Sequence, residues 1–453
     1  MRPTQPTASG TAAFETVHYV FIFTALGSLA LAVSLLAARP RWITQYFYFS
    51  TMLSLTHLVT LGFVTSLMMG VLYRLAPLGL SITPRSRRMA TMQCALFVIG
   101  ASGMVFHFWI AEYSGMAWAT TFVWLATVIQ LWNFSRLFSP DKLRQPARAF
   151  VAAGMIYLVV AASIGVALGF QKIGVTLPFA DLSLLDRLSV HIHLALVGWI
   201  LHCIIGFQTR LLPSTAGGVV GQWVRFLMLQ IGLGGLTASL LFDLPYRGWF
   251  AMLIALVVIG HTVGPVRLLV RKRFWEWELI PSAFALVAAG LGAGLAWGIP
   301  DEPESRAAFQ AAYVYAGLFG YVVLTIIITV FKLFPMWVWK GRFAKEFGRR
   351  PVPGMKALAD HRLMVGHHLL LALGIGGTVV SLLAQSESWM AAFLGIQWVG
   401  VVLFLSNFVR VARWRFLSTL TYEPQESDWQ KFREMFPAMD ARSGGATTPQ
   451  RRQ

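Results

Sequence analysis

The sequence predicts an all-α polytopic membrane protein, in which twelve transmembrane helices form three pseudo-symmetric four-helix units. Hydrophobic residues make up 57% of the 453 residues and charged residues only 12%, whereas soluble domains carry about 25% charged residues. Twelve apolar runs are long enough to cross a hydrocarbon layer about 30 Å thick, and a lipid-facing backbone must satisfy its own hydrogen bonds as helix. A motif that occurs three times predicts the division into units.

The apolar runs define a membrane domain over residues 17–412, between an N-terminal tail at 1–16 and a mobile C-terminal tail at 413–453. The first run follows one arginine and no small-residue cleavage site, so we expect a retained helix and not a signal peptide. The runs cover residues 17–38, 47–76, 89–111, 114–137, 149–170, 187–212, 222–243, 249–270, 278–298, 309–334, 363–384 and 389–412.

The net charge of +18 is distributed unevenly between the two predicted sides of the membrane. If loops alternate between two sides, the side with both termini has 31 Lys+Arg and 11 Asp+Glu, and the other side has 6 and 8, which gives +20 and −2. The positive-inside rule then predicts that both termini are cytoplasmic, in a bacterial-type inner membrane. The lipid bilayer is therefore the expected partner, and the positive charge does not indicate nucleic-acid binding.

A motif recurs in the second, sixth and tenth runs. Its first copy, from His57, is HLVTLGFVTSLMMGVLYRLAP, and its second, from His193, is HLALVGWILHCIIGFQTRLLP. Both carry glycine at +5 and +13, an aromatic residue at +6, arginine at +17 and proline at +20. The third copy, YAGLFGYVVLTIIITVFKLFP, begins at Tyr315 and replaces the histidine by tyrosine. The copies start 136 and 122 residues apart, which predicts three four-helix units.

Most motif residues have a structural explanation. Glycine allows helices to approach closely, a basic residue suits the cytoplasmic helix end, and proline is expected to end the helix. His57 and His193 lack such an explanation, because ionisable groups inside a membrane are costly and often functional. We therefore expect them to be ligands, with a hydrogen-bonded structural histidine as the alternative.

Four histidines are predicted to form a group in the periplasmic half. At 1.5 Å rise per residue, His57 lies about 14 Å, His191 and His193 about 6–9 Å, and His107 about 6 Å from the periplasmic helix ends. Since successive residues turn by about 100°, His191 and His193 face opposite sides of one helix.

A second predicted pair lies deeper, at about 18–22 Å. His202 and His261 could hold a second haem, bind copper or zinc through their imidazoles, or share a buried hydrogen bond. By contrast, we expect His361, His367 and His368 to be solvated residues at the cytoplasmic interface, and His18, at the cytoplasmic end of helix one, to have no ligand role. Cys94 and Cys203 are expected to be small core residues.

The cytoplasmic termini, the repeated units and the histidines near the periplasmic ends of helices two and six resemble the haem–copper oxidase superfamily. The closest likeness is to small subunit-I-like proteins with an H-L-x-x-x-G motif, and it spans about residues 17–412. The resemblance implies b-type haem, with His57 as a haem ligand and His193 or His191 as a copper ligand. It also implies a c-type cytochrome or quinol as electron donor.

The chain departs from that family at several ligand positions. Helix seven, GQWVRFLMLQIGLGGLTASLLFD, lacks the family's histidine pair, and helix ten has Tyr313 and Tyr315 in place of its histidines. Val197 stands where a tyrosine is expected, and no carboxylate lies well inside a run. We therefore expect a haem protein for electron transfer or gas sensing and no complete oxygen-reducing oxidase. Whether it catalyses a reaction stays open.

Two other functions remain open. The chain resembles the NnrS family of nitric-oxide-response haem–copper proteins in its helix number and its H-x-x-x-x-G segments, but it lacks that family's W-H-x-H-E opening. The missing histidines also fit a metal-free scaffold or transporter on the same fold. No GxxxxGK[ST], GxSxG or HExxH motif is present, so nucleotide hydrolysis and soluble hydrolase chemistry have no support.

Overall fold

The computed structural model describes residues 14–176, 183–211, 218–271, 279–300, 302–417 and 422–435. Within these ranges all regular elements are helical, and eleven helices are long and apolar enough to cross a membrane. A shorter apolar helix, Ser282–Leu295, lies in the predicted ninth run. The prediction of an all-α protein with many membrane-spanning helices is confirmed.

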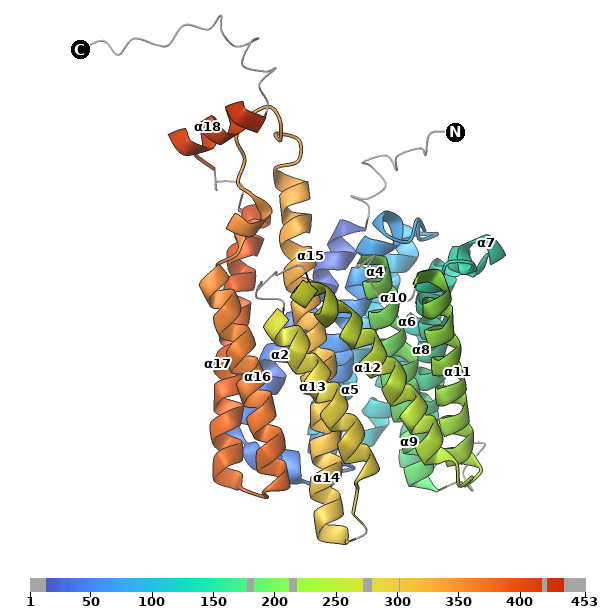
Figure 1. Cartoon of the computed structure of the whole chain (residues 1–453). Helices are drawn as coiled ribbons and strands as arrows, with labels where there is room; N and C mark the ends of the chain where they lie inside the picture. Colours follow the sequence, from blue (N-terminus) through green and yellow to red (C-terminus); the bar gives the residue numbers. More distant parts are fainter. Residues whose placement is uncertain are drawn as a thin grey trace, which may run out of the picture.

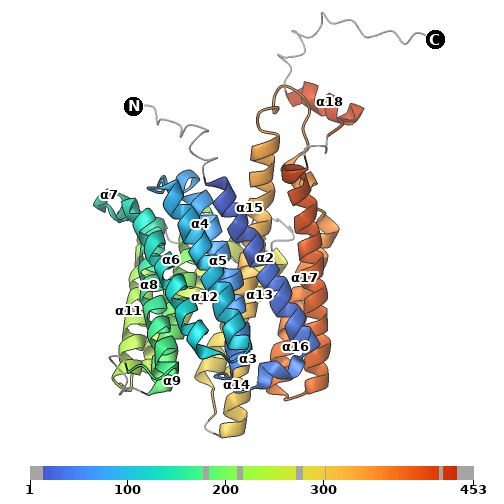
Figure 2. The ribbon, with the colours of Figure 1, turned by 180° about the vertical axis from the view of Figure 1, so that it is seen from behind.

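The helices lie along a common direction, and α18 lies at the end of the bundle where α2 begins and α17 ends (Figures 1 and 2). The long elements are α2 (Glu15–Ala38), α3 (Ser50–His57), η2 (Leu58–Thr65), α4 (Ser66–Leu78), α5 (Arg87–Trp109), α6 (Tyr113–Asn133), α8 (Pro146–Lys172), α9 (Leu184–His193), η4 (Leu194–Leu201), α10 (His202–Leu211), α11 (Gly218–Leu241), α12 (Arg247–Arg271), α13 (Leu279–Trp297), α14 (Pro303–Tyr315), η5 (Ala316–Val323), α15 (Leu324–Arg342), α16 (His361–Leu383) and α17 (Glu387–Phe416). Short helices are η1 (Pro40–Thr44), η3 (Ser135–Phe138), α7 (Pro140–Leu143), η6 (Met355–Leu358) and α18 (Glu426–Met435).

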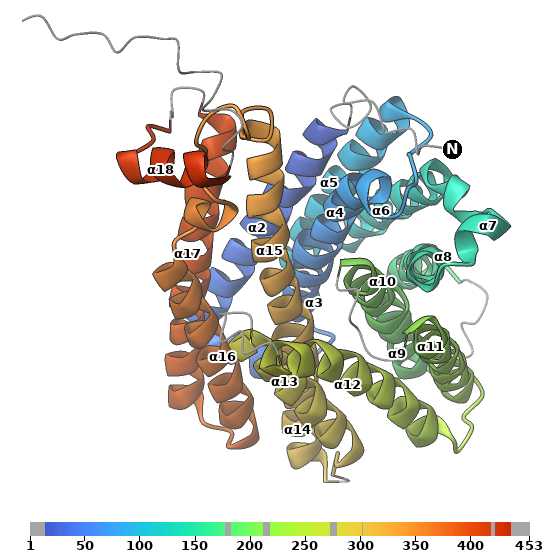
Figure 3. The ribbon, with the colours of Figure 1, turned by 45° about the horizontal axis from the view of Figure 1, so that its top comes forward.

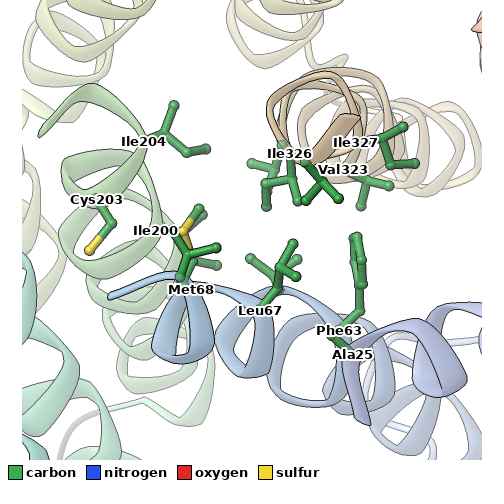
Figure 4. Packing of buried hydrophobic residues seen from close by; sticks show 14 of the residues in the cluster. Ala25, Phe63, Leu67, Met68, Ile200, Cys203, Ile204, Val323, Ile326 and Ile327 are labelled. Atoms are coloured by element: carbon green, nitrogen blue, oxygen red, sulfur yellow. The ribbon is translucent and has the colours of Figure 1, made fainter. Parts of the chain in front are cut away.

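The three motif helices lie inside a closed arrangement of the others. Helix α6 packs on α8, α12 on α13, and α17 returns to α2. Figure 3 shows α4, α10 and α15 near the middle of the bundle. Buried side chains from all three helices share one core, among them Leu67, Ile204 and Ile327, as Figure 4 shows. Burial of apolar side chains therefore places the three motif copies next to one another.

Each motif helix contains an eight-residue π-helical segment that starts directly after the first motif residue. These segments are η2 after His57, η4 after His193 and η5 after Tyr315. A π-helix has i→i+5 hydrogen bonds, is rare, and often marks a functional site. The repeated sequence thus corresponds to a repeated backbone conformation, which the sequence alone did not predict.

The motif glycines allow the close helix approach that was expected. A Cβ added at Gly62 would lie 2.6 Å from Oγ of Ser28 in α2, and one at Gly198 would lie 2.7 Å from Cβ of Tyr157 in α8. The glycine of the third copy meets α13 in the same way, at 2.8 Å. Each π segment therefore packs against another long helix at a point where a side chain has no room.

At two equivalent places, an asparagine side chain forms two hydrogen bonds with the backbone of the residue that caps a helix. We call this arrangement the asparagine clamp. Asn133 accepts a hydrogen bond from the backbone N–H of Ser86 at 2.8 Å and donates one to its carbonyl at 3.1 Å. Asn407 makes the same two bonds with Asp360, both at 2.9 Å. Both pairs are 47 residues apart in sequence. Because Ser86 and Asp360 are the N-caps of α5 and α16, the two devices hold corresponding helices.

The prediction that the motif proline ends the helix is wrong for the third copy, and Pro213 of the second copy lies outside the described residues. Pro335 lies inside α15, which continues to Arg342, and Pro77 lies inside α4, which ends one residue later. Proline removes one backbone hydrogen bond, and neighbouring helices can compensate for that loss in a membrane bundle. Further along, α17 extends to Phe416, and α18 lies within the predicted tail.

Candidate functional site

His57 is the last residue of α3 and leaves one ring nitrogen without a partner. Its Nδ1 lies 2.7 Å from the carbonyl oxygen of Leu53, which can only accept, so Nδ1 carries the proton. The ring stacks on Phe108 of α5 with centroids 5.3 Å apart and planes at 19°. His57 is therefore held in one orientation by the hydrogen bond at Nδ1, and its neutral form presents a lone pair at Nε2.

His191 and His193 have the same arrangement on α9. Nδ1 of His191 donates to the carbonyl of Ala161 in α8 at 2.9 Å, and Nδ1 of His193 donates to the carbonyl of Ser189 at 2.7 Å. His191 also presses on α8, since a Cβ added at Gly165 would lie 3.0 Å from its Cε1. Both imidazoles thus also present Nε2 as a lone pair.

Protein atoms do not fully cover the Nε2 atoms of these three histidines. None forms a hydrogen bond with the described residues, and none belongs to the buried polar atoms that lack a partner. The side chains are partly exposed. An imidazole lone pair fixed by a hydrogen bond at the other nitrogen is the usual form of a metal-binding histidine. We call His57, His191 and His193 the imidazole group.

Two members of the imidazole group lie equally far from the starts of their own helices. His57 is seven residues from the start of α3 and His191 seven residues from the start of α9, which is about 10 Å along each helix. The two rings are close enough to interact electrostatically, whereas His193 faces another side of α9. Both helices lie at the end of the bundle away from α18 (Figure 2).

The deeper histidines use both ring nitrogens. Nδ1 of His202 donates to the carbonyl of Val197 at 2.8 Å, and its Nε2 accepts from the amide of Gln230 at 2.7 Å. Tyr157 donates to the same amide at 2.5 Å. This chain of hydrogen bonds satisfies a side chain that has no exposed area.

His261 is satisfied in the same way by other partners. Its Nε2 donates to Oε1 of Gln208 at 2.8 Å, and its Nδ1 lies 3.4 Å from a guanidinium nitrogen of Arg225. His202 and His261 thus bind separate glutamines, and each keeps no lone pair for a metal.

His107 contacts Glu112, the N-cap of α6. Its Nδ1 lies 2.9 Å from Oε2 of Glu112, and 30% and 44% of the two side chains are exposed. Glu112 also caps α6 by accepting from the backbone of Ser114 and Gly115. These hydrogen bonds lower the pKa of the Glu112 carboxyl, and the one from the Gly115 N–H has the largest effect.

Two histidines expected to be solvated are in the core, so that expectation is wrong. His367 and His368 have 0% and 1% of their surface exposed, and their rings are 4.2 Å apart. Phe331 and Phe404 cover His367. Asp360 and the exposed His361 mark the start of α16, and the helix turns the later histidines inward from there.

The sequence analysis did not predict a functional role for a pair of cations near the ends of α8 and α9. Nζ of Lys172, at the end of α8, lies 3.9 Å from the ring centroid of Tyr48 and 4.6 Å from that of Tyr113. Arg187 of α9 bonds the side chain of Gln171 in α8. Lys172 and Arg187 are two of only six Lys+Arg on the predicted periplasmic side, and this scarcity was a signal that could have identified them.

The donor set fits a haem. Among the residues with described positions, no three His, Cys, Asp or Glu side chains converge as a metal site. A haem iron needs only one or two protein ligands, because the porphyrin supplies its other four nitrogens. Cys94 and Cys203 are free and buried, in line with the core role expected for them.

No family model matches the chain, and no curated protein matches it. The function is therefore inferred from the geometry of the imidazole group.

Proposed function

We propose that this chain is an integral membrane haem protein resembling cytochrome oxidase subunit I, which holds b-type haem for electron transfer or gas sensing. The observation that carries the proposal is the imidazole group, whose three Nε2 atoms have no hydrogen-bond partner among the described residues of their membrane-spanning helices. An ionisable side chain with a free ring nitrogen inside such a helix is a candidate ligand.

The residues around the site suit a haem in three ways. Backbone carbonyls fix the orientation and tautomer of each imidazole and raise its basicity. Phe108 stacks on the His57 ring and holds its plane. Phe108 also belongs to an apolar cluster with Leu53 and Met104 beside this ring. When bound, a haem supplies one-electron chemistry or a gas-binding iron, and the chain's own residues hold and orient it.

We also propose twelve membrane helices in three four-helix units, with both termini cytoplasmic in a bacterial-type inner membrane. The π segments, the equivalent glycine contacts and the repeated asparagine clamp support the units. Counting α13 as a spanning helix makes the number of crossings even. A c-type cytochrome or quinol is the proposed electron donor.

Oxygen reduction is not part of the proposal. Tyr315 takes the place of a helix-ten histidine, is 4% exposed, and donates to Gln397 at 2.5 Å. That phenol is held by its own hydrogen bond and is no haem ligand of the expected kind. Copper binding is likewise not part of the proposal, and metal analysis of the purified protein would detect it.

The test is absorbance of the purified protein, oxidised and dithionite-reduced. We expect a Soret band and stoichiometric iron in the wild type, a loss of at least half of the haem in His57→Ala, and full retention in His107→Ala. All variants are first checked for folding by size-exclusion chromatography. A folded wild-type protein without iron or a Soret band would refute the proposal, and copper equal to iron would favour a haem–copper protein.

A further inference from the structure

Three elements meet around the Lys172 side chain. Its Nζ lies against the rings of Tyr48, which precedes α3, and Tyr113, which begins α6. The Tyr113 hydroxyl is also 2.5 Å from Oγ of Ser50, the first residue of α3. The ends of α3, α6 and α8 are thereby fixed next to one another at one rim.

Arg187 brings α9 to the same rim. Its guanidinium donates to Gln171, the residue before Lys172, and to the carbonyl of Ser183 at 3.4 Å. It also interacts electrostatically with Tyr48. Two positive charges thus share a small area between four elements.

Neither cation has a carboxylate partner among the residues that the structure describes. Both are half-buried, so water screens them less than it would on an open surface. By contrast, Arg247 and Arg41 on the same predicted side each pair with a carboxylate, at 2.7 and 2.8 Å. Within the described part of the rim, two cations thus lie close together and could bind an anion.

Helical register places both cations between His191 and the nearby ends of α8 and α9. Arg187 precedes His191 by four residues, one turn of about 6 Å, on the same face of α9. Lys172 follows Gly165 by seven residues, two turns of about 10 Å, and Gly165 is the point of α8 that touches His191. A haem has the same layout, with both carboxylates on one edge and the iron further in.

We propose that Lys172 and Arg187 bind the two propionates of a haem whose iron is held by His57 and His191. This inference rests on the proposed function. It assigns the axial pair to α3 and α9, and it leaves His193 outside that pair. Two axial imidazoles fill both open positions of the iron, so the site is one for electron transfer and not for gas binding.

The first experiment measures the rate of haem transfer from the purified, full-length protein to excess apomyoglobin. Removing one charge-assisted hydrogen bond is expected to speed haem loss roughly tenfold, so we expect about a hundredfold for Lys172→Met with Arg187→Met. Arg247→Met is the matched control and should lose haem at the wild-type rate. The reduction potential of the double variant should also fall, because two nearby positive charges no longer disfavour the oxidised iron.

An iron porphyrin with both propionates esterified separates carboxylate binding from general stability. We expect the wild type and the double variant to release the ester at equal rates. The propionate role is wrong if the double variant releases haem at the wild-type rate. It is also wrong if the double variant releases the ester and haem faster than the wild type by the same factor. A wild type without haem would refute the proposed function itself, before either comparison is made.

Spin state tests the axial pair. His57→Ala and His191→Ala should each convert a low-spin to a high-spin spectrum, whereas His193→Ala should stay low-spin. A high-spin spectrum in His193→Ala together with a low-spin one in His191→Ala would overturn the assignment. Addition of carbon monoxide to the reduced wild type should leave the spectrum unchanged, and a shift would also contradict two axial imidazoles.

Discussion

At the scale of single residues, the partners of the ring nitrogens distinguish His57, His191 and His193, which leave Nε2 without a partner among the described residues, from His202 and His261, which use both nitrogens. The apolar context of the sequence singled out His57, His191, His193, His202 and His261 alike. It could not separate them, because Gln230 and Gln208 lie 28 and 53 residues from the histidines that they bind. Such long-range partners follow from helix packing, which a single sequence does not reveal.

The first prediction concerns the amide that satisfies His202. Gln230→Leu leaves the buried Nε2 of His202 and the Tyr157 hydroxyl without a partner, so we expect a loss of about 1–3 kcal/mol in the free energy of unfolding. Haem content should not change. Thermal unfolding in detergent, with the exposed Gln430→Leu as control, checks this. Loss of the Soret band in a folded Gln230→Leu protein would show that His202 matters for haem.

At the scale of elements, hydrophobicity predicted the positions of the helices well but did not predict the details of their backbone conformation. The twelve predicted runs fall within the observed helices or within a few residues of their ends, because long apolar segments have only one stable form in lipid. The π segments, the asparagine clamps and the continuation past Pro335 depend on contacts with other helices. The motif glycines were the one sequence signal of such contacts.

The second prediction tests those glycines. Gly198→Ala forces a methyl group against Tyr157 of α8, and we expect overpacking to cost about 1–3 kcal/mol. Gly27→Ala in α2 meets open space and should be neutral or slightly stabilising. Thermal unfolding of both variants beside the wild type is the measurement. Equal unfolding temperatures for the two alanine variants would contradict the close approach.

The third prediction concerns the cap of α6. Since hydrogen bonds lower the pKa of Glu112 in the folded protein, its stabilisation is present above its unfolded pKa of about 4.3 and is lost as pH falls through the folded value. Glu112→Gln should therefore unfold at a lower temperature than the wild type at pH 7. The difference should shrink below pH 4. A difference that grows on acidification would have the wrong sign.

At the scale of the whole molecule, contacts between α2 and α17 close the bundle. Glu15 pairs with Arg415 at 2.9 Å, and Trp398 donates to Ser34 at 3.0 Å, across 400 and 364 residues of sequence. The order of helices predicted a bundle, but this closure joins residues from opposite ends of the chain. It also puts the start of α2 and the end of α17 on one side, which agrees with the even number of crossings that we propose.

The fourth prediction tests that sidedness with thiol labelling. The native Cys94 and Cys203 are buried, so they should give little background. Ser388→Cys, exposed at the start of α17, should react with an impermeant maleimide in intact spheroplasts. Gln425→Cys, exposed just before α18, should react only after lysis. The opposite pattern would invert the proposed topology.

The measurement that tests the central claim most directly is the haem-to-chain ratio of the purified protein, determined as the pyridine haemochrome. The imidazole group predicts at least one b-type haem per wild-type chain and none at that site in the His57→Ala, His191→Ala double variant. A folded wild-type chain without haem, or a double variant with the wild-type ratio, would contradict the claim that these imidazoles hold a haem.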